Sequence, residues 1–294
     1  MENKSDIKAL VQLCDDPDEN IYNQIKHELI SYGKDAIPFL EESWIHNDYD
    51  LLFQSRIEKL IPEIQYNSIK NDLKTWINKP NKSLLEGALL IASYQYPNIN
   101  KEKIRSEIKY IRDSIWLELN DRQTAFEKVT IFNKIFYGQH KFIGDKKNYN
   151  SPMNSYLNTV IETRKGNPLS LSILYSLIAQ SLKMPIFGVN LPNHFILTYI
   201  DENKINNLIK KNNNHGTLFY INAFSKGTIF EEMEIDSFLK KINLPYSREY
   251  YEPCSNSTII YRMLSNLINS HKKNNQKKRV RDLTELKNLF NRII

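Results

Sequence analysis

One stretch, from Arg164 to Ile200, constrains the fold of this chain more than any other. It holds an asparagine and a proline, then an apolar segment of helical length, then short segments rich in β-forming residues. Asn167 can cap a helix whose first residue is Pro168, because a residue without an N–H is tolerated at that position. A helix followed by strands predicts an α+β core with this helix at its centre.

The apolar residues of this helix cover a broad surface, as expected of a helix buried on several sides. They are Leu169, Ile173, Leu174, Leu177, Ile178 and Leu182. Three segments rich in β-branched and aromatic residues are predicted to be strands: 187–190, 194–200 and 217–223. A buried central helix on a small antiparallel sheet is therefore the predicted core of a predominantly helical α+β protein.

The residues before this core, 1–120, carry helix signals at short intervals. Asp16 is predicted to cap a helix that Gly33 ends. A further helix is expected over 51–77, with a break at Pro62, because a proline inside a helix removes a donor and clashes with the preceding turn. Short helical pairs with small loops resemble the hairpins of HEAT-type solenoids, so we expect a HEAT-like leader.

The excess of positive charge is local. The chain has 40 Lys and Arg residues against 34 Asp and Glu, a formal charge of +6. Six of the cations lie in one run without an acid, and they are Lys272, Lys273, Lys277, Lys278, Arg279 and Arg281. Such a run without interleaved aromatic residues is typical of a solvated surface. Nucleic acid is therefore an unlikely partner, and nucleic-acid association through 272–281 is the weaker alternative.

No apolar run reaches the roughly 18 residues that cross a bilayer, and the N-terminus lacks the apolar segment of a secretory signal. We expect a soluble cytoplasmic protein without a membrane partner. The two cysteines, Cys14 and Cys254, have no His or Cys at ligand spacing. No disulfide framework, metal site or cofactor is expected.

Three motifs carry a resemblance to a known family: Asn-Ser-Tyr-Leu-Asn at 154–158, Arg-Lys-Gly-Asn-Pro-Leu-Ser-Leu at 164–171, and Gly-Val-Asn-Leu-Pro-Asn-His-Phe at 188–195. They resemble the transglutaminase-like core of the bacterial invasion-regulator-B family, a core that also occurs in an F-box protein. In bacteria this core often precedes tetratricopeptide (TPR) repeats.

The resemblance implies three domains. They are a helical leader over 1–120, a transglutaminase-like core over 121–245 and a TPR-like helix pair over 246–294. In the last of these, the apolar residues of 258–270 and 280–293 recur at helical spacing. One pair is too short to form an independent solenoid, so we expect it to dock on the core.

The wider transglutaminase and papain-like superfamily implies a catalytic Cys at the start of the central helix, a His on the following strand and an Asp or Asn on the next. A helix N-terminus and a neighbouring imidazolium both lower the pKa of a thiol. In this chain Pro168 stands at the expected Cys position, while His194 and Asn222 match the other two. Ser170 is a nearby hydroxyl.

Two functions follow as hypotheses. The first is a module that has lost its catalytic Cys and binds a peptide or protein partner, with Arg164, Asn167, Asn193 and Tyr199 lining a groove at the helix N-terminus. The alternative, from a different class, is an active acyl-transfer enzyme, such as a peptidase or hydrolase. In that case Ser170 would be the nucleophile, His194 its base and Asn222 the residue that orients His194. The oligomeric state is left open.

Overall fold

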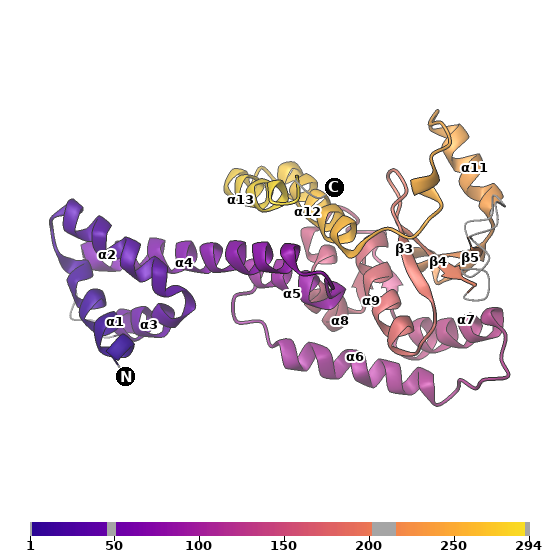
Figure 1. The fold of residues 1–294 in the computed structure, drawn as a ribbon, viewed down its shortest axis with the longest axis horizontal. Coiled ribbons are helices and arrows are strands. Elements are labelled where there is room, and N and C mark those ends of the chain that lie inside the picture. The colour runs from indigo at the N-terminus through magenta and orange to yellow at the C-terminus, as the bar shows by residue number, and fades with distance from the viewer. Residues whose placement is uncertain (1, 46–50, 202–215, 292–294) are drawn as a thin grey trace. The chain divides into compact units, whose positions relative to one another are not determined.

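The structure is a computed structural model that describes residues 2–45, 51–201 and 216–291. The chain forms two compact units, shown as ribbons in Figure 1. The first unit comprises Met1–Asn78 with Ser93–Pro97, and the second comprises Lys79–Ala92 with Asn98–Ile294.

The first unit is helical. Its elements are α1 (Glu2–Gln12), α2 (Glu19–Tyr32), α3 (Ile37–Ile45) and α4 (Leu51–Asn78). Apolar side chains of all four helices share one core, and those buried in it are Ile7, Val11, Cys14, Ile25, Leu29, Ala36, Leu40, Phe53, Ile57, Leu60 and Ile64. Burial of this apolar surface is the main favourable contribution to folding of the unit.

Two predictions about this unit need correction. The cap of α2 is Asp18, whose carboxylate accepts from Asn20 N at 2.8 Å, whereas Asp16 accepts from Asp18 N in the preceding turn. The predicted break at Pro62 is wrong, because α4 continues through it. Buried Leu60 and Ile64 hold the helix in the core on both sides of the proline. The predicted end of α2 at Gly33, with φ 61°, is confirmed.

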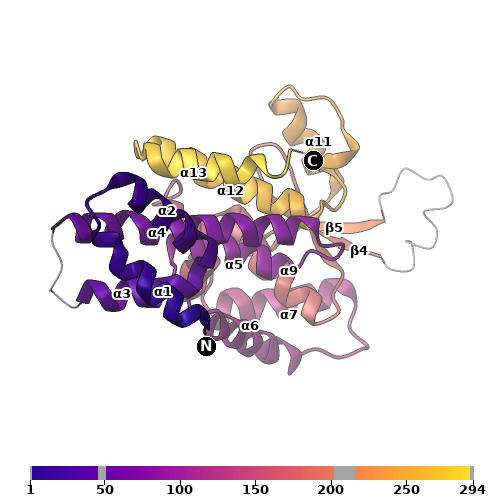
Figure 2. The ribbon, with the colours of Figure 1, turned by 60° about the vertical axis from the view of Figure 1, so that its left-hand side comes forward.

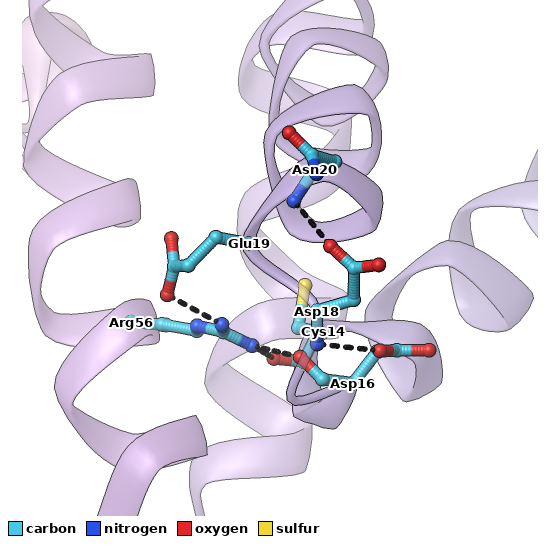
Figure 3. Close-up of polar contacts among 6 residues, drawn as sticks. All are labelled: Cys14, Asp16, Asp18, Glu19, Asn20 and Arg56. Atoms are coloured by element: carbon cyan, nitrogen blue, oxygen red, sulfur yellow. Dashed lines mark hydrogen bonds and ion pairs between the residues drawn. The ribbon is translucent and has the colours of Figure 1, made fainter.

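A buried arginine holds the turn between α1 and α2 (Figure 3). Arg56 of α4 donates to the backbone oxygens of Cys14 at 2.9 Å and Asp16 at 2.6 Å, and to Glu19 Oε1 at 2.8 Å. Its guanidinium also lies 4.0 Å from the ring centroid of Tyr22. These contacts satisfy polar groups that the turn would otherwise bury without partners.

The second unit is an α+β fold. Its first helices are α5 (Leu84–Gln95), of which the part up to Ala92 belongs to this unit, α6 (Lys101–Trp116), α7 (Ala125–Asn133) and α8 (Leu157–Thr163). The central helix α9 (Pro168–Ser181) contacts α6, α8 and the sheet, and most of its side chains are buried. The predicted fold class, a buried central helix on a small antiparallel sheet in a largely helical chain, is confirmed.

The sheet has the strand order β3-β4-β5-β6, and all its neighbours are antiparallel. The strands are β3 (Ile186–Val189), β4 (Ile196–Ile200), β5 (Thr217–Asn222) and β6 (Thr228–Phe230). β4 is buried along its whole length. The three predicted strands correspond to β3, β4 and β5, with β4 beginning two residues later than predicted.

Two features were not predicted from the sequence: strand β6 and a two-stranded parallel pair, β1 (Ile143–Gly144) with β2 (Lys165–Gly166). The close approach of Phe224 explains the glycine in β1. A Cβ on Gly144 would lie 2.6 Å from the Phe224 ring. The parallel pair joins the segment before α8 to the residues directly before α9, so it fixes where α9 begins.

After the sheet come α11 (Glu232–Lys241), α12 (Asn256–Lys273) and α13 (Lys277–Asn288). The last two lie side by side in Figures 1 and 2, and α12 also contacts α9. This confirms the predicted C-terminal helix pair as helices, while its likeness to TPR repeats and that of the leader to HEAT repeats stay predictions. Within the described residues, no helix is both long and apolar enough to cross a membrane.

Candidate functional site

The start of α9 is closed by a reciprocal cap. The Asn167 side chain accepts from Ser170 N at 2.9 Å, and Ser170 Oγ accepts from Asn167 N at 3.0 Å. Ser170 Oγ then donates to Asn154 O at 2.6 Å. Pro168 occupies the first helical position and has no N–H to satisfy. A Cβ on Gly166 would lie 2.7 Å from Ser170 Oγ, so the glycine leaves room for this cap.

A groove of about 720 Å³ opens beside this helix start. It is within the size range of protein sites for small ligands. Its lining comes from four places: the loop before α8, the start of α9, the β3–β4 loop and one face of α12. The lining residues are Tyr149, Asn150, Asn167, Pro168, Leu169, Asn190, Pro192, Asn193, His194, Phe195, Tyr261, Arg262, Ser265, Asn266, Asn269, Ser270 and Lys273.

His194 lies in the β3–β4 loop rather than on a strand, and its side chain is exposed. Its ring meets the edge of Phe238 with centroids 4.9 Å apart. Partial desolvation of the ring by its surroundings and the nearby positive charge of Arg262 lower the pKa of His194 below its ordinary value. The imidazole is therefore neutral at pH 7. Asn193, directly before it, has φ 59°, a conformation that asparagine tolerates.

Four of the predicted site residues come together in the groove, and they are Asn167, Pro168, Asn193 and His194. Ser170 is not among the lining residues, since its side chain is only 2% exposed. Its hydroxyl hydrogen bonds go to residues 154 and 167, and within the described residues none joins it to His194.

The other three predicted residues lie elsewhere in the second unit. Asn222 ends β5, and its Oδ1 accepts from Phe224 N and Ser225 N, both at 3.1 Å. Within the described residues no hydrogen bond joins Asn222 to His194.

Arg164 pairs with Glu107 at 3.1 Å, and its guanidinium lies 5.0 Å from the Phe142 ring centroid. Tyr199 is buried in β4, where its ring packs against Phe219. Neither Arg164 nor Tyr199 lines the groove.

The contribution of α12 to the groove was not predicted from the sequence. Arg262 Nη1 donates to Asn190 Oδ1 at 3.1 Å and to Leu191 O at 3.4 Å, which ties α12 to the β3–β4 loop. Lys273 Nζ donates to Asn150 Oδ1 at 2.7 Å at the other end of the same helix. The signal in the sequence was a polar stripe, since residues 262, 266, 269 and 273 recur at helical spacing.

The groove is positive and amide-rich. Arg262, Lys273 and the neutral His194 line it together with six asparagines, and none of its lining residues is an Asp or a Glu. Burial lowers the pKa of Arg262 below its usual value, although the guanidinium stays charged at pH 7. No cluster of three or more His, Cys, Asp or Glu suited to a metal ion occurs in the described ranges.

The central helix, the antiparallel sheet and the loop histidine beside the helix start define a transglutaminase-like α+β protein. The family model for the Transglutaminase-like superfamily matches residues 102–265, more than half of the chain. The chain therefore belongs to this superfamily, and the wider family predicted from the sequence is confirmed.

Curated relatives include an F-box protein and bacterial proteins. The chain is 26% identical to F-box only protein 21 of Homo sapiens over 240 residues, which is 74% of this chain and 37% of that protein. It is 32% identical to a UPF0162 protein of Xylella fastidiosa over 131 residues (43% of this chain, 45% of that protein). A UPF0162 protein of Vibrio cholerae is 25% identical over 187 residues (62% and 64%).

The chain thus spans little more than a third of the length of the F-box relatives. No solved structure matches it significantly.

Proposed function

We propose that this protein is a transglutaminase-like module without a catalytic cysteine, which binds a peptide or protein partner as a regulatory or scaffold protein. One observation carries the proposal. Pro168 opens α9 at the point where the family resemblance expects the nucleophile, yet a groove lies beside it with His194 and Asn193 in its wall. The arrangement keeps a place for a ligand, and no thiol is among the lining residues.

The two native thiols support this view. Burial raises the pKa of Cys14 to about 12 and that of Cys254 to about 12. A thiol with such a pKa is a poor nucleophile at neutral pH, because only the thiolate attacks. Neither cysteine is among the lining residues of the groove.

The alternative, an acyl-transfer enzyme built on Ser170, His194 and Asn222, draws less support. Ser170 Oγ is occupied in the cap of α9, and Asn222 caps a turn after β5. A serine nucleophile needs its base within hydrogen-bond reach. The contacts of these side chains favour structural roles.

The first experiment tests for chemistry. The wild-type protein is incubated with a serine-directed fluorophosphonate and with a thiol-directed iodoacetamide at pH 7.5, and labelled residues are located by mass spectrometry. We expect no labelling at Ser170 and slow labelling of both cysteines. Rapid labelling of Ser170 that is lost in His194→Gln would overturn the proposal in favour of an enzyme.

A variant tests whether Pro168 stands at the nucleophile position. In a background with Cys14→Ser and Cys254→Ser, Pro168→Cys introduces a thiol at the start of α9. If the position matches, the helix N-terminus lowers its pKa. We expect iodoacetamide to react with it faster than with a control cysteine at Asn288, an exposed residue of α13 outside the groove. Equal rates would contradict the assignment.

The second experiment tests for binding. A random peptide library displayed on phage is selected on the wild type and on Asn269→Trp, which fills the groove from α12. Asn288→Trp is the matched control, because Asn288 is exposed and not a lining residue. We expect enrichment on the wild type and on the control variant, and its loss on Asn269→Trp. Equal enrichment on all three would count against a peptide site in the groove.

The finer assignments belong to the same proposal. We keep the nearer kinship with the invasion-regulator-B family, the TPR-like C-terminal pair over 246–294, the HEAT-like leader over 1–120, the core over 121–245 and a cytoplasmic location as predictions. The family match over 102–265 supports a core that reaches into α12. Nucleic-acid association through 272–281 stays the weaker alternative.

A further inference from the structure

The groove beside α9 has an unusual balance of charge for this chain. The chain contains 34 Asp and Glu residues, yet none of them lines this groove, whereas Arg262 and Lys273 do. A second hollow of about 510 Å³ shares Tyr149 and Asn150 with it and adds Lys146 and Lys147, again with no acid in its lining. Cationic side chains therefore line both hollows, and the two hollows share part of their lining.

Arg262 is only partly used by the protein itself. Both of its hydrogen bonds leave from Nη1 and end on neutral oxygens, and in the described part of the chain no carboxylate pairs with it. A guanidinium has five N–H donors in a rigid fork that suits a carboxylate. The contact to Asn190 keeps the group in place and leaves Nε and Nη2 without a described hydrogen bond.

Amides stand between the cations. Asn266 and Asn269 lie on α12 between Arg262 and Lys273, and Asn193 lies opposite in the β3–β4 loop. Within the described residues, no hydrogen bond involves the side chains of these three asparagines. A carboxamide both donates and accepts, so it can pair with the N–H and C=O groups of an extended peptide.

The length of the row fits such a ligand. Arg262 and Lys273 are eleven positions apart on one helix face, which is about 16 Å at the rise of an α-helix. An extended chain covers that distance in about five residues. Resting on the proposed function, we infer that the occupant of the groove is an extended acidic segment of a partner protein, whose carboxylates pair with Arg262 and Lys273 and whose backbone meets the asparagines.

A single-stranded nucleic acid would also satisfy the cations, but the aromatic rings of the lining suit it less. Bases bind such grooves mainly by stacking on aromatic faces. The ring of Tyr261 lies under Lys287, 4.5 Å from its centroid, and meets Phe290 on its edge. Tyr149 packs against Phe224, and Phe195 is buried. These contacts occupy the rings within the protein and favour the peptide.

The test uses defined probes: a short fluorescein-labelled peptide of alternating glutamate and glycine, its glutamine counterpart, and a labelled single-stranded DNA of similar length. Affinities are measured by fluorescence anisotropy with the full chain. We expect the glutamate peptide to bind more tightly than the other two. Arg262→Gln should weaken its binding about 10- to 100-fold, the effect of losing a charge-assisted contact.

A matched pair of lysines separates the groove from general charge. Lys273→Gln should weaken the glutamate peptide about two- to fivefold, as expected of a surface ion pair. Lys272→Gln removes the same charge from an exposed residue outside the lining and should change affinity by less than about twofold. Circular dichroism confirms that each variant is folded. Lys273→Gln keeps Arg262 intact, so this variant tests the acidic ligand even if Arg262→Gln does not fold.

The outcomes are distinct. If the glutamine peptide binds as well as the glutamate peptide and both are lost in Asn269→Trp, the acidic ligand is wrong while the peptide-binding function stands. If only the DNA binds, both are wrong. Equal losses in Lys272→Gln and Lys273→Gln would place the acidic ligand on the basic run rather than in the groove and overturn the inference.

Discussion

Two arginines, Arg56 buried and Arg262 partly buried, differ in the groups that surround them. Arg56 of the first unit donates to two backbone oxygens and to Glu19 (Figure 3). Its guanidinium also covers the Tyr22 ring. Arg262 of the second unit has two neutral acceptors and no carboxylate within the described residues. Both guanidinium groups have lost part of their hydration. Of the two, only Arg56 pairs with a carboxylate of the described residues, that of the exposed Glu19.

This difference separates an arginine that stabilises the fold from one whose donors are available to a ligand. Breaking a closed polar network leaves buried acceptors unsatisfied, so its cost falls on stability. A charge held at the edge of a groove by a few neutral contacts contributes little to stability, and its unused donors can meet a ligand. The comparison therefore predicts that equivalent substitutions at the two arginines affect different properties of the protein.

The largest expected effect is on folding at Arg56. Arg56→Met removes three hydrogen bonds from the turn between α1 and α2 and should lower the free energy of unfolding by about 3 kcal/mol. Arg262→Met should change it by less than about 1 kcal/mol. Urea unfolding followed by circular dichroism measures both. A loss at Arg262→Met as large as that at Arg56→Met would break the comparison.

The second prediction gives Arg262 the anion that Arg56 already has. Asn266 lies four residues after Arg262 on α12, so Asn266→Glu places a carboxylate beside the guanidinium. The new side chain should occupy Arg262 and repel an acidic ligand, and the affinity for the glutamate peptide should fall by about tenfold or more. Asn266→Gln keeps the size and the amide and serves as the control.

Unchanged binding in Asn266→Glu would show that the peptide does not reach this part of α12. A similar loss in Asn266→Gln would show that the shape of the asparagine, rather than the charge balance of the groove, controls binding. Fluorescence anisotropy with the same probe measures both variants.

The parts of the fold that could be predicted from the sequence are those with local causes. The cap at Asn167, the proline at position 168 and the apolar run after them are enough to define α9, and the strand segments are continuous in sequence. Strand β6 was missed because three residues carry no periodic pattern. The predicted break at Pro62 failed because core packing on both sides of the proline outweighs a local preference.

The site was predicted in part, for the same reason. Pro168 and His194 lie within the sequence motifs that indicate them. Arg262 and Lys273 reach the groove only because α12 packs beside α9, a contact between segments that are far apart in the chain. The hydrogen-bond partners of a side chain could not be predicted from its residue type either. Ser170 resembles a nucleophile in the sequence, whereas in the structure its hydroxyl caps the helix.

The third prediction tests the cap of α9 formed by Asn167 and Ser170, whose hydrogen bonds join uncharged groups, unlike those of Arg56. Ser170→Ala removes the bonds to Asn167 and Asn154 and should lower the free energy of unfolding by about 1 kcal/mol. Ser172, two residues further along α9, is fully buried, and its hydroxyl has no hydrogen-bond partner within the described residues. Ser172→Ala should therefore be neutral or stabilising. Thermal and urea unfolding compare the two, and equal losses would contradict the cap.

The smallest expected effect is on the pH dependence of ligand affinity in the groove that Arg262 and His194 line. Burial and the charge of Arg262 lower the pKa of His194, so the free protein protonates this ring only below the ordinary range near 6.5. Its neighbour from α11 is the uncharged ring of Phe238, which leaves Arg262 of α12 as the described charge acting on it. A bound carboxylate favours the imidazolium and raises that pKa.

A pKa that is higher in the complex than in the free protein means that binding takes up protons. The affinity for the glutamate peptide should therefore rise as pH falls and decline as pH rises through the pKa of the complex. We expect a gain of about two- to fivefold between pH 7.5 and 5.5, where glutamates with a pKa near 4.3 are still charged. His194→Gln should flatten this profile, because glutamine does not titrate in this range, and the slope is compared rather than the affinity at one pH. An equal slope in His194→Gln would assign the proton uptake to another group and remove His194 from the wall that meets the ligand's charge.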